Sequence, residues 1–235
     1  SMLALGGEIY VKKATVEYHA SARLDDTLDV GMQSTRIGNS SCLFTAGIFC
    51  GDRLLISAEL VYVFADPATQ TSRPVPPALR AIFEGFEAGA EMAEVRTGDW
   101  NTLGRDAGRV RTAVFVHEQG IPAEVEADIH DISARHAVLY NRLGMPIAAG
   151  RLLQPSPGLG RIGRMAVDRS VRGAQWGRQL LDALVDAARA RGDTEVQLHA
   201  QSSAEGFYRR AGFAVVGEPY EEAGIAHIAM ARQLQ

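Results

Sequence analysis

The stretch VRGAQWGRQLLDAL, residues 171–184, joins a glycine-containing turn directly to an amphipathic helix. Apolar residues recur downstream at helical spacing, which predicts a helix that buries one face and ends at Gly192. The buried stripe is expected to consist of Leu180, Leu181, Leu184, Val185 and Ala188. Because the preceding residues GRIGRMAVD (160–168) read as a strand, the sequence predicts a strand, a tight turn and a helix in succession.

The start of this helix has the features of an anion site. The first amide groups of a helix have no partner within it, and the helix dipole adds positive charge there. Gly173 and Gly177 allow a ligand to approach the backbone closely, and Arg172 adds a cation suited to phosphate. The alternative is that both glycines only allow the helix to pack tightly against the strand.

The longer stretch MAVDRSVRGAQWGRQLL, residues 165–181, resembles the acyl-CoA signature of the GNAT N-acetyltransferase superfamily. The resemblance implies that an Arg/Gln-x-x-Gly-x-Gly turn binds the coenzyme A pyrophosphate. Arg172, Gly173 and Gly177 match this pattern, whereas Gln175 stands where a central glycine is usual. We expect right-handed helical angles at Gln175, because a positive φ would strain a residue that carries a side chain.

The resemblance covers residues 91–235 and continues through VRTAVFVHEQGIPAEVEADIHDISARHAVLY, GRLL, IGRMAV, LHAQ, FYRRAGF and EEAGIAHIAMAR. It implies the mixed α/β sheet of the GNAT fold, splayed between its fourth and fifth strands to admit the pantetheine arm of acetyl-CoA or another acyl-CoA. The backbone of Met165 and Val167 is then expected to bind the pantetheine amides. The full set of expected cofactor-binding residues is Met165, Ala166, Val167, Arg172, Gly173, Ala174, Gln175, Trp176, Gly177, Arg178 and Gln201.

Acyl transfer to an amine needs a neutral nitrogen, a polarised carbonyl and a proton for the departing thiolate. A backbone N–H near Met165 is expected to stabilise the oxyanion. The resemblance implies that Tyr208, in FYRRAGF, protonates the coenzyme A sulfur. The alternative is that Tyr208 is an aromatic residue that packs on the sheet.

The general base is expected at the C-terminal end of the first helix within residues 91–235. Glu118, in VFVHEQG, is the first choice because it lies on the segment that borders the acceptor site in the resembling fold. His117, Glu124 and Glu126 compete with it, and ordered water is a further route for the proton. The pattern LGRDAGRVRTAVFVHEQG predicts that this helix places Val110, Ala113 and Val114 on one face.

Three histidines, His136, His199 and His227, lie in predicted strands, where histidines are usually core residues. His199 and Gln201 also flank the expected splay and are candidates to line the acceptor pocket. No pattern in the sequence indicates a metal site.

The first 90 residues follow a different pattern. Four strands between Tyr10 and Phe64 are predicted to form an antiparallel meander, with breaks at Asp25-Asp26, Gly38-Asn39 and Gly51-Asp52. A helix follows in PALRAIFEGFEAG, where Leu79, Ile82, Phe83 and Phe86 have helical spacing before Gly89. One short helix cannot cover a sheet whose strands are apolar on more than one side, so a partner surface is predicted.

Residues 9–86 resemble the later strands of a hotdog-fold acyl-CoA thioesterase of the hydroxybenzoyl-CoA type. The resemblance lies in VKKATVEYHASARLDDTLDV, STRIGNSSCLFTAGIF and LLISAELVYVFADPATQTSRPVPPALRAIF. That family's first strand and its central helix, which carries a catalytic Asp, are missing, so no thioesterase nucleophile or base is assigned. Asp25, Asp26 and Asp29 read as turn acids. Hotdog domains pair through their sheets, which implies a homodimer or larger homo-oligomer.

Composition limits the partners of the chain. With 235 residues and 46% hydrophobic content, two domains are predicted, residues 1–90 and 91–235. The 28 acidic and 24 basic residues give a net charge of −4, which offers no cationic surplus for nucleic acid or an anionic membrane.

Cysteine content and hydropathy indicate the cellular compartment in which the protein is expected. Cys42 and Cys50 are too few for a disulfide framework and lack the companions of a zinc site, so they are expected to be buried free thiols. The apolar stretch LLISAELVYVFA, residues 54–65, is too short to span a bilayer, and no signal peptide is recognised. We therefore expect a cytoplasmic protein.

The sequence as a whole predicts an α+β protein with an incomplete hotdog-like antiparallel sheet followed by a GNAT mixed α/β sheet. The predicted function is an acyl-CoA-dependent N-acyltransferase, most simply one that acetylates a primary amine of a small molecule or peptide. The alternatives are thioester hydrolysis by the first half, or a coenzyme A-binding or assembly module without turnover. The acceptor does not follow from the sequence, because a fold does not fix its substrate.

Overall fold

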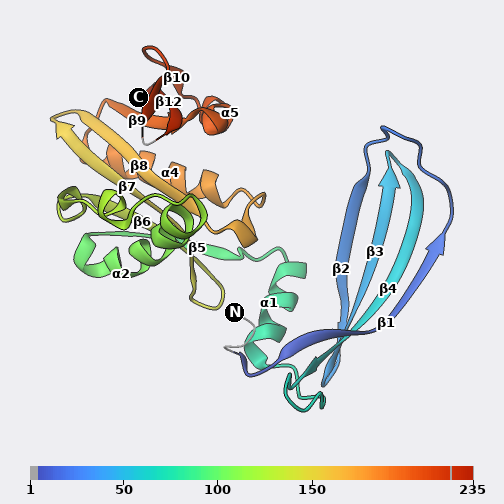
Figure 1. The fold of residues 1–235 in the computed structure, drawn as a ribbon. Helices are drawn as coiled ribbons and strands as arrows, with labels where there is room; N and C mark the ends of the chain where they lie inside the picture. Colours follow the sequence, from blue (N-terminus) through green and yellow to red (C-terminus); the bar gives the residue numbers. More distant parts are fainter. Residues whose placement is uncertain (1–4, 223, 235) are drawn as a thin grey trace. The chain divides into compact units, whose positions relative to one another are not determined.

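The computed structural model describes residues 5–222 and 224–234, and the chain divides into two compact units, residues 1–92 and 93–235 (Figure 1). Each unit is built on its own β-sheet, four-stranded in the first unit and eight-stranded in the second.

The first unit is an antiparallel sheet with the strand order β1-β4-β3-β2. Tight turns join β2 to β3 and β3 to β4 where the sequence predicts them. The predicted meander is wrong for β1, which pairs with β4, because residues 19–28 form a long connection rather than a hairpin turn. The elements are β1 (Glu8–Tyr18), β2 (Asp29–Ile37), β3 (Ser41–Cys50), β4 (Arg53–Ala65) and α1 (Pro77–Glu87).

One face of this sheet is apolar across its four strands. Helix α1 covers the part of that face around Phe44, where Leu79 and Phe83 pack. Contrary to the predicted stripe, Phe86 at the end of α1 is 60% exposed. The register places two further apolar rows on the same face, Tyr18-Ile56-Ile48-Val30 and Val16-Ala58-Ala46-Met32. In these rows Tyr18, Val30 and Met32 are exposed, so α1 leaves this end of the face bare.

The second unit is a mixed sheet with helices on both faces. Its strand order is β10-β12-β9-β8-β7-β6-β5, with β11 paired to β12 off that path. The strands are β5 (Ala93–Gly98), β6 (Arg135–Asn141), β7 (Pro146–Ser156), β8 (Leu159–Val167), β9 (Glu195–Gln201), β10 (Ala214–Val215), β11 (Tyr220–Glu222) and β12 (Ile225–Gln233). The helices are α2 (Trp100–Arg111), α3 (Ala123–Glu126), α4 (Trp176–Arg191) and α5 (Glu205–Arg210), with short helical turns η3 (Ile129–Asp131), η4 (Arg169–Val171) and η5 (Ser202–Ala204).

The two faces of the second sheet have separate cores. The predicted stripe of α4 is buried, and it packs with Ile162 of β8 and Leu198 of β9. Helix α2 packs on the opposite face, where Leu103 and Ala107 contact Ala166 of β8.

The sheet splays between β8 and β9, as the GNAT resemblance implies. These parallel strands are paired only from Leu159 opposite Glu195 to Ile162 opposite Leu198. Both strands continue beyond that point without pairing to each other, to Val167 and Gln201. A wedge therefore opens in the middle of the sheet.

A bulge in β8 lies at the start of this wedge. Arg164 and Met165 together oppose Gly150 of β7, and Arg164 has a φ of +53°. The extra residue reverses the alternation of side chains along β8. Ile162 consequently packs on the α4 side of the sheet, whereas Ala166 packs on the α2 side.

The long helix predicted to reach Gln119 is two helices in the structure. Helix α2 begins after Asp99, whose side chain accepts a hydrogen bond from the Thr102 amide at 2.9 Å, and the wider π-helix η2 (Thr112–Glu118) follows it. Val110 and Val114 are buried as predicted. Ala113 is exposed, because the wider turns of η2 shift it away from the stripe.

The turn before α4 contradicts the expected backbone of Gln175. This residue has left-handed angles, with φ at +62° and ψ at 10°, and Gly173 has a φ of +91°. The Gln175 carbonyl oxygen accepts hydrogen bonds from the amides of Arg178, at 2.9 Å, and Gln179, at 3.2 Å. These bonds begin α4 and offset the cost of the left-handed conformation.

We predict that Gln175→Gly stabilises the second unit by up to about 1 kcal/mol, because a left-handed residue with a Cβ is strained by about that amount. Gln175→Val should destabilise the unit, since a β-branched residue tolerates this conformation poorly. The measurement is urea unfolding followed by the fluorescence of Trp100 and Trp176, both of which belong to the second unit.

Gln179→Gly is the matched control, because it introduces glycine on the exposed side of α4 and should lower stability by about 1 kcal/mol. A Gln175→Gly protein that loses as much stability as this control would contradict the strain argument.

Candidate functional site

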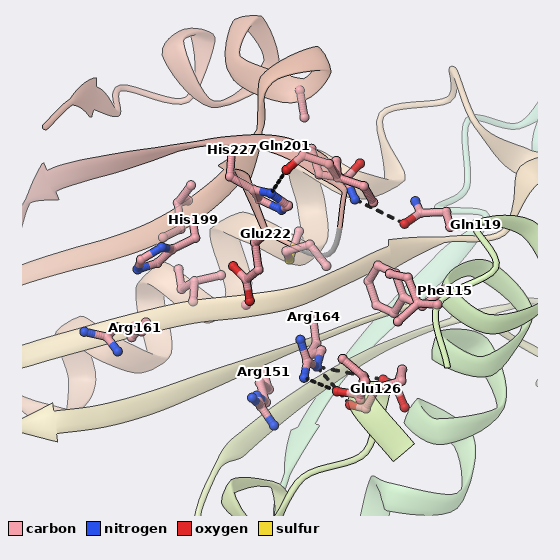
Figure 2. Close-up of a pocket in the computed structure, with 18 of the residues that line it drawn as sticks. Phe115, Gln119, Glu126, Arg151, Arg161, Arg164, His199, Gln201, Glu222 and His227 are labelled. Atoms are coloured by element: carbon pink, nitrogen blue, oxygen red, sulfur yellow. Dashed lines mark hydrogen bonds and ion pairs between the residues drawn. The ribbon is translucent and has the colours of Figure 1, made fainter. Parts of the chain in front are cut away.

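A cavity of about 420 Å³ lies at the wedge between β8 and β9 (Figure 2). This volume lies within the range of small-molecule sites. Its wall is formed by Arg161–Met165 of β8, by His199 and Gln201 of β9, and by Tyr208 of α5. Further lining residues come from η2 and the residue after it, from α3, from β7, and from β11 and β12. They include Phe115, Gln119, Glu126, Arg151, Leu153, Glu222 and His227.

Two of the three predicted strand histidines face this cavity. His199 and Gln201 line it as predicted, and the Gln201 side-chain amide donates to Gln119 Oε1 at 3.1 Å. His227 also lines it, and its Nδ1 donates to the Ile225 carbonyl at 2.8 Å. His136 is a core residue, fully buried, with Nε2 donating to the Asp131 carbonyl at 2.9 Å.

Tyr208 both packs in the core and reaches the cavity. Its ring makes edge contacts with Phe207 and Phe213, at centroid distances of 4.9 and 6.0 Å. No hydrogen bond joins its hydroxyl to any described residue. Burial raises the pKa of Tyr208 to about 12, so the hydroxyl keeps its proton at neutral pH. The cavity therefore contains a proton donor that is not engaged elsewhere in the described chain.

Glu118, the expected base, is not among the residues that line the cavity. Both of its carboxylate oxygens accept hydrogen bonds from the Arg172 guanidinium at 2.7 Å. These bonds lower the pKa of Glu118, which makes it a weaker base. The position and the pairing of Glu118 thus oppose the expected catalytic role.

The competing bases are also poorly placed. His117 and Glu124 are exposed and do not line the cavity. Glu126 does line it, but Glu126 is buried and its carboxylate binds the Arg111 guanidinium.

A buried charge network under the cavity has no counterpart in the sequence predictions. Arg111 is 1% exposed and binds Asp131 through two hydrogen bonds of 2.8 and 2.9 Å. Arg151 binds both Asp128 and Asp131 at 2.7 Å, and Arg164 donates to Asp128 at 3.1 Å. Arg151 and Arg164 line the cavity, yet their charges are already compensated by this network.

The turn before α4 exposes backbone amides. Within the described chain, no group accepts a hydrogen bond from the amides of residues 173–177. A Cβ added at Gly177 would lie 3.5 Å from Val167 and 3.6 Å from Phe207, which are ordinary contact distances. Packing therefore does not require glycine at this position, and free amides at the start of a 16-residue helix suit an anion.

The arginines of this turn are bound within the chain. Arg172 Nε donates to the Val167 carbonyl at 3.0 Å, in addition to its pairing with Glu118. Arg178 pairs with Asp182 at 2.8 Å and donates to the Arg210 carbonyl at 3.1 Å. The expectation of a free Arg172 cation for phosphate is therefore not met, and the backbone remains the part of the turn that is open to a ligand.

Cys42 is a buried free thiol, and Cys50 is a half-buried one. The described residues contain no group of three or more His, Cys, Asp or Glu side chains arranged to hold a metal ion. In the same residues, no helix combines the length and the apolar character needed to cross a membrane.

A family model described as an acetyltransferase (GNAT) domain matches residues 103–234, more than half of the chain. An uncharacterized N-acetyltransferase of Bacillus subtilis, YjcF, is 38% identical over 127 residues, which cover 54% of this chain and 89% of YjcF. Protein ElaA of Escherichia coli is 35% identical over 130 residues, which cover 54% of this chain and 84% of ElaA.

Solved structures agree with these matches. The crystal structure of Escherichia coli ElaA has a TM-score of 0.55 and 31% identity, and the match covers 60% of this chain and 99% of ElaA. The crystal structure of an acyl-CoA N-acyltransferase from Pseudomonas aeruginosa has a TM-score of 0.54 and 34% identity, and the match covers 60% of this chain and 99% of that protein.

These matches leave the hotdog resemblance of the first unit unsupported. What the structure provides there is an antiparallel four-stranded sheet. Asp26 accepts a hydrogen bond from the Arg23 amide at 2.7 Å, and Asp25 has a φ of +68°, as turn residues do. No observation in this unit favours the thioester hydrolase alternative.

We predict that Asp128 gives the second unit an acid-labile share of its stability. Hydrogen bonds from Arg151 lower the pKa of Asp128 from 3.8 to about 2, so its ion pairs stabilise the fold above about pH 4. This stabilisation, about 2 kcal/mol, is lost as the pH falls through the folded pKa toward 2. Asp128→Asn should therefore flatten the fall in urea stability between pH 5 and pH 3, measured by tryptophan fluorescence.

Asp186→Asn is the control, because Asp186 is 71% exposed and its pair with Arg189 lies at the surface of α4. If the Asp128→Asn protein kept the full acid sensitivity of the parent, the network would not be its source.

Proposed function

This chain belongs to the GNAT acetyltransferase family, and from that premise we propose that it acetylates the amine of a small molecule bound in the cavity at the wedge. It is an acetyltransferase enzyme, and the family uses an acyl-CoA as co-substrate. The choice of acetyl-CoA as donor and of a small amine as acceptor is our proposal. The observation that carries it is the juxtaposition of the cavity, the splayed strands and the protonated Tyr208.

The donor binds along the turn and the wedge. The backbone amides of residues 173–177 bind the pyrophosphate, supported by the dipole of α4. Trp176 and Ala174 contribute their amides to this turn, and Ala166, being buried, contributes only backbone to the wedge. Arg172 holds the turn in place through Glu118 and the Val167 carbonyl rather than by contacting phosphate.

The pantetheine arm enters where β8 and β9 are not paired, and Met165 and Val167 bind its amides there. A backbone N–H near Met165 stabilises the oxyanion formed when the amine attacks the thioester carbon. The C–S bond then breaks, and Tyr208 gives its proton to the departing sulfur. Because Glu118 is bound to Arg172, we assign the loss of the amine proton to ordered water in the cavity.

Tyr208→Phe should lower kcat for acetyl transfer by about 100-fold, the usual contribution of a positioned proton donor, with the KM for acetyl-CoA nearly unchanged. The assay follows free thiol released from acetyl-CoA in the presence of a panel of primary amines. Full activity of the Tyr208→Phe protein would exclude this role. Absence of amine-dependent thiol release in the parent would contradict the proposed function, and release without any amine would favour thioester hydrolysis instead.

Tyr140→Phe is the matched control. Its pKa is also raised by burial to about 12, but its hydroxyl donates to Asp106 at 2.7 Å and it does not line the cavity. The control should retain the parent kcat.

We also infer that the first unit pairs with a second copy of the chain. The bare apolar rows beyond α1 expose more large hydrophobic side chains than a monomer usually leaves together. Among the described residues, no further strand pairs with the edge strands β1 and β2. A second copy presents the same apolar surface, so the two faces are complementary by symmetry.

Met32→Glu should shift the protein from dimer or larger assembly to monomer, because it places a charge in the bare apolar face. Light scattering coupled to size-exclusion chromatography measures the change. Gln33→Glu is the control, since the next residue of β2 points to the opposite face and should leave the mass unchanged. A parent protein that is already monomeric would overturn this inference.

A further inference from the structure

Two charged side chains at the cavity wall have no partner in the described part of the chain. They are Arg161 of β8 and Glu222 of β11, both exposed (Figure 2). The other charged side chains of the wall are engaged in the buried network, Arg151 and Arg164 through Asp128, and Glu126 through Arg111. Among the described residues of the wall, the cavity thus offers a ligand one arginine and one glutamate that are not paired within the chain.

The strand register places these charges on one face of the sheet. Arg161 is paired with Gln197, which lies two residues before His199 on β9, and Glu222 is paired with Ile225 on β12. Paired residues and every second residue along a strand share a face. Burial lowers the pKa of His199, and Arg161 lowers it further while Glu222 acts in the opposite direction, so both charges lie within electrostatic reach of His199.

The wall between Arg161 and the wedge is bare backbone. Gly163 lies between them, and a Cβ added there would meet no atom within 4 Å. Arg161 precedes Met165 by four residues, which is about 13 Å of extended strand before the bulge shortens it. A ligand whose amine lies at the wedge therefore has room to extend along β8 toward the guanidinium.

We propose that the acceptor is an amine that also carries a carboxylate, such as an ω-amino acid or a short peptide-like acid, and that Arg161 binds this carboxylate. The guanidinium is suited to bidentate binding of a carboxylate, and Glu222 attracts the ammonium end of the same molecule. The inference rests on the proposed acetyl transfer. In that step the ammonium first loses one proton to ordered water. The neutral amine nitrogen then bonds to the acetyl carbon as the C–S bond breaks, a second proton leaves nitrogen to water, and Tyr208 gives one proton to sulfur, while the carboxylate is unchanged.

The test compares each acid with its neutral amide, using γ-aminobutyrate and ε-aminocaproate as the acids and acetyl-CoA as the donor. We expect kcat/KM to favour the acids by roughly tenfold to a hundredfold, the size of one hydrogen-bonded charge pair. Arg161→Ala should remove the preference by lowering the rate with the acids alone, and Arg161→Lys should restore part of it. Equal rates for acid and amide in the parent, or an undiminished preference in Arg161→Ala, would overturn the proposal.

Two further variants separate a specific role from a general one. Glu222→Gln should raise the KM of acids and amides alike, because it acts on the ammonium that both share. Arg105→Ala removes an exposed arginine of α2 that does not line the cavity, and it should change neither rate. Melting temperatures of all variants check that each one folds.

Failure of the proposed function is distinguishable from failure of this inference. If acids and amides are acetylated equally, acetyl transfer stands and the carboxylate site does not. If no amine is acetylated, calorimetry of γ-aminobutyrate and its amide with the coenzyme A-bound protein still measures whether Arg161 selects the acid. Equal binding of the two in that experiment would overturn the proposal independently.

Discussion

The end of pairing between β8 and β9 is the constraint on which the rest of the second unit depends. Two parallel strands that remain paired leave no room for a ligand between them, because the backbone N–H and C=O groups of each strand bind those of the other. Here the ladder stops at Ile162 and Leu198, and the bulge at Arg164 reverses the side chains that follow. Backbone polar groups of β8 beyond that point are therefore available to a ligand, and the cavity forms beside them.

The buried charge network stabilises the part of the cavity wall that contains Glu126, Arg151 and Arg164. Arg111, Asp131 and Arg151 are nearly inaccessible to solvent, and removing one member would leave a buried charge without its partner. The network joins the end of α2, together with α3 and η3, to β7 and β8, so it fixes the distance between the two walls. It also uses the charges of Arg151 and Arg164. Of the described arginines that line the cavity, Arg161 therefore remains open to a ligand.

The resemblance to the GNAT superfamily predicted the second fold and much of its site, and local periodicity predicted its individual helices and strands. The strand, turn and helix around residue 171 and the burial of the α4 stripe depend on local periodicity, whereas the position of His199 and Gln201 at the wedge follows from the resemblance. Contacts between distant residues were not predictable in this way. The pairing of Glu118 with Arg172 and the network around Arg111 join charged residues that a pattern assigns to the surface.

Backbone geometry was the second source of error. Gln175 adopts a left-handed conformation that its side chain disfavours, at the point where α4 begins. Ala113 is exposed because η2 has the wider turns of a π-helix rather than those of an α-helix. In the first unit, β1 pairs with β4 rather than with β2. The alternation of residues within the strands does not predict this pairing, which goes with the long connection formed by residues 19–28.

The central claim is that an acyl-CoA lies in the wedge with its pyrophosphate on the turn before α4. Backbone amide NMR during a titration with coenzyme A tests it most directly. The account predicts that the largest shifts fall on residues 173–177 and 165–167. Unchanged spectra, or shifts confined to the first unit or to the far end of the second sheet, would contradict it.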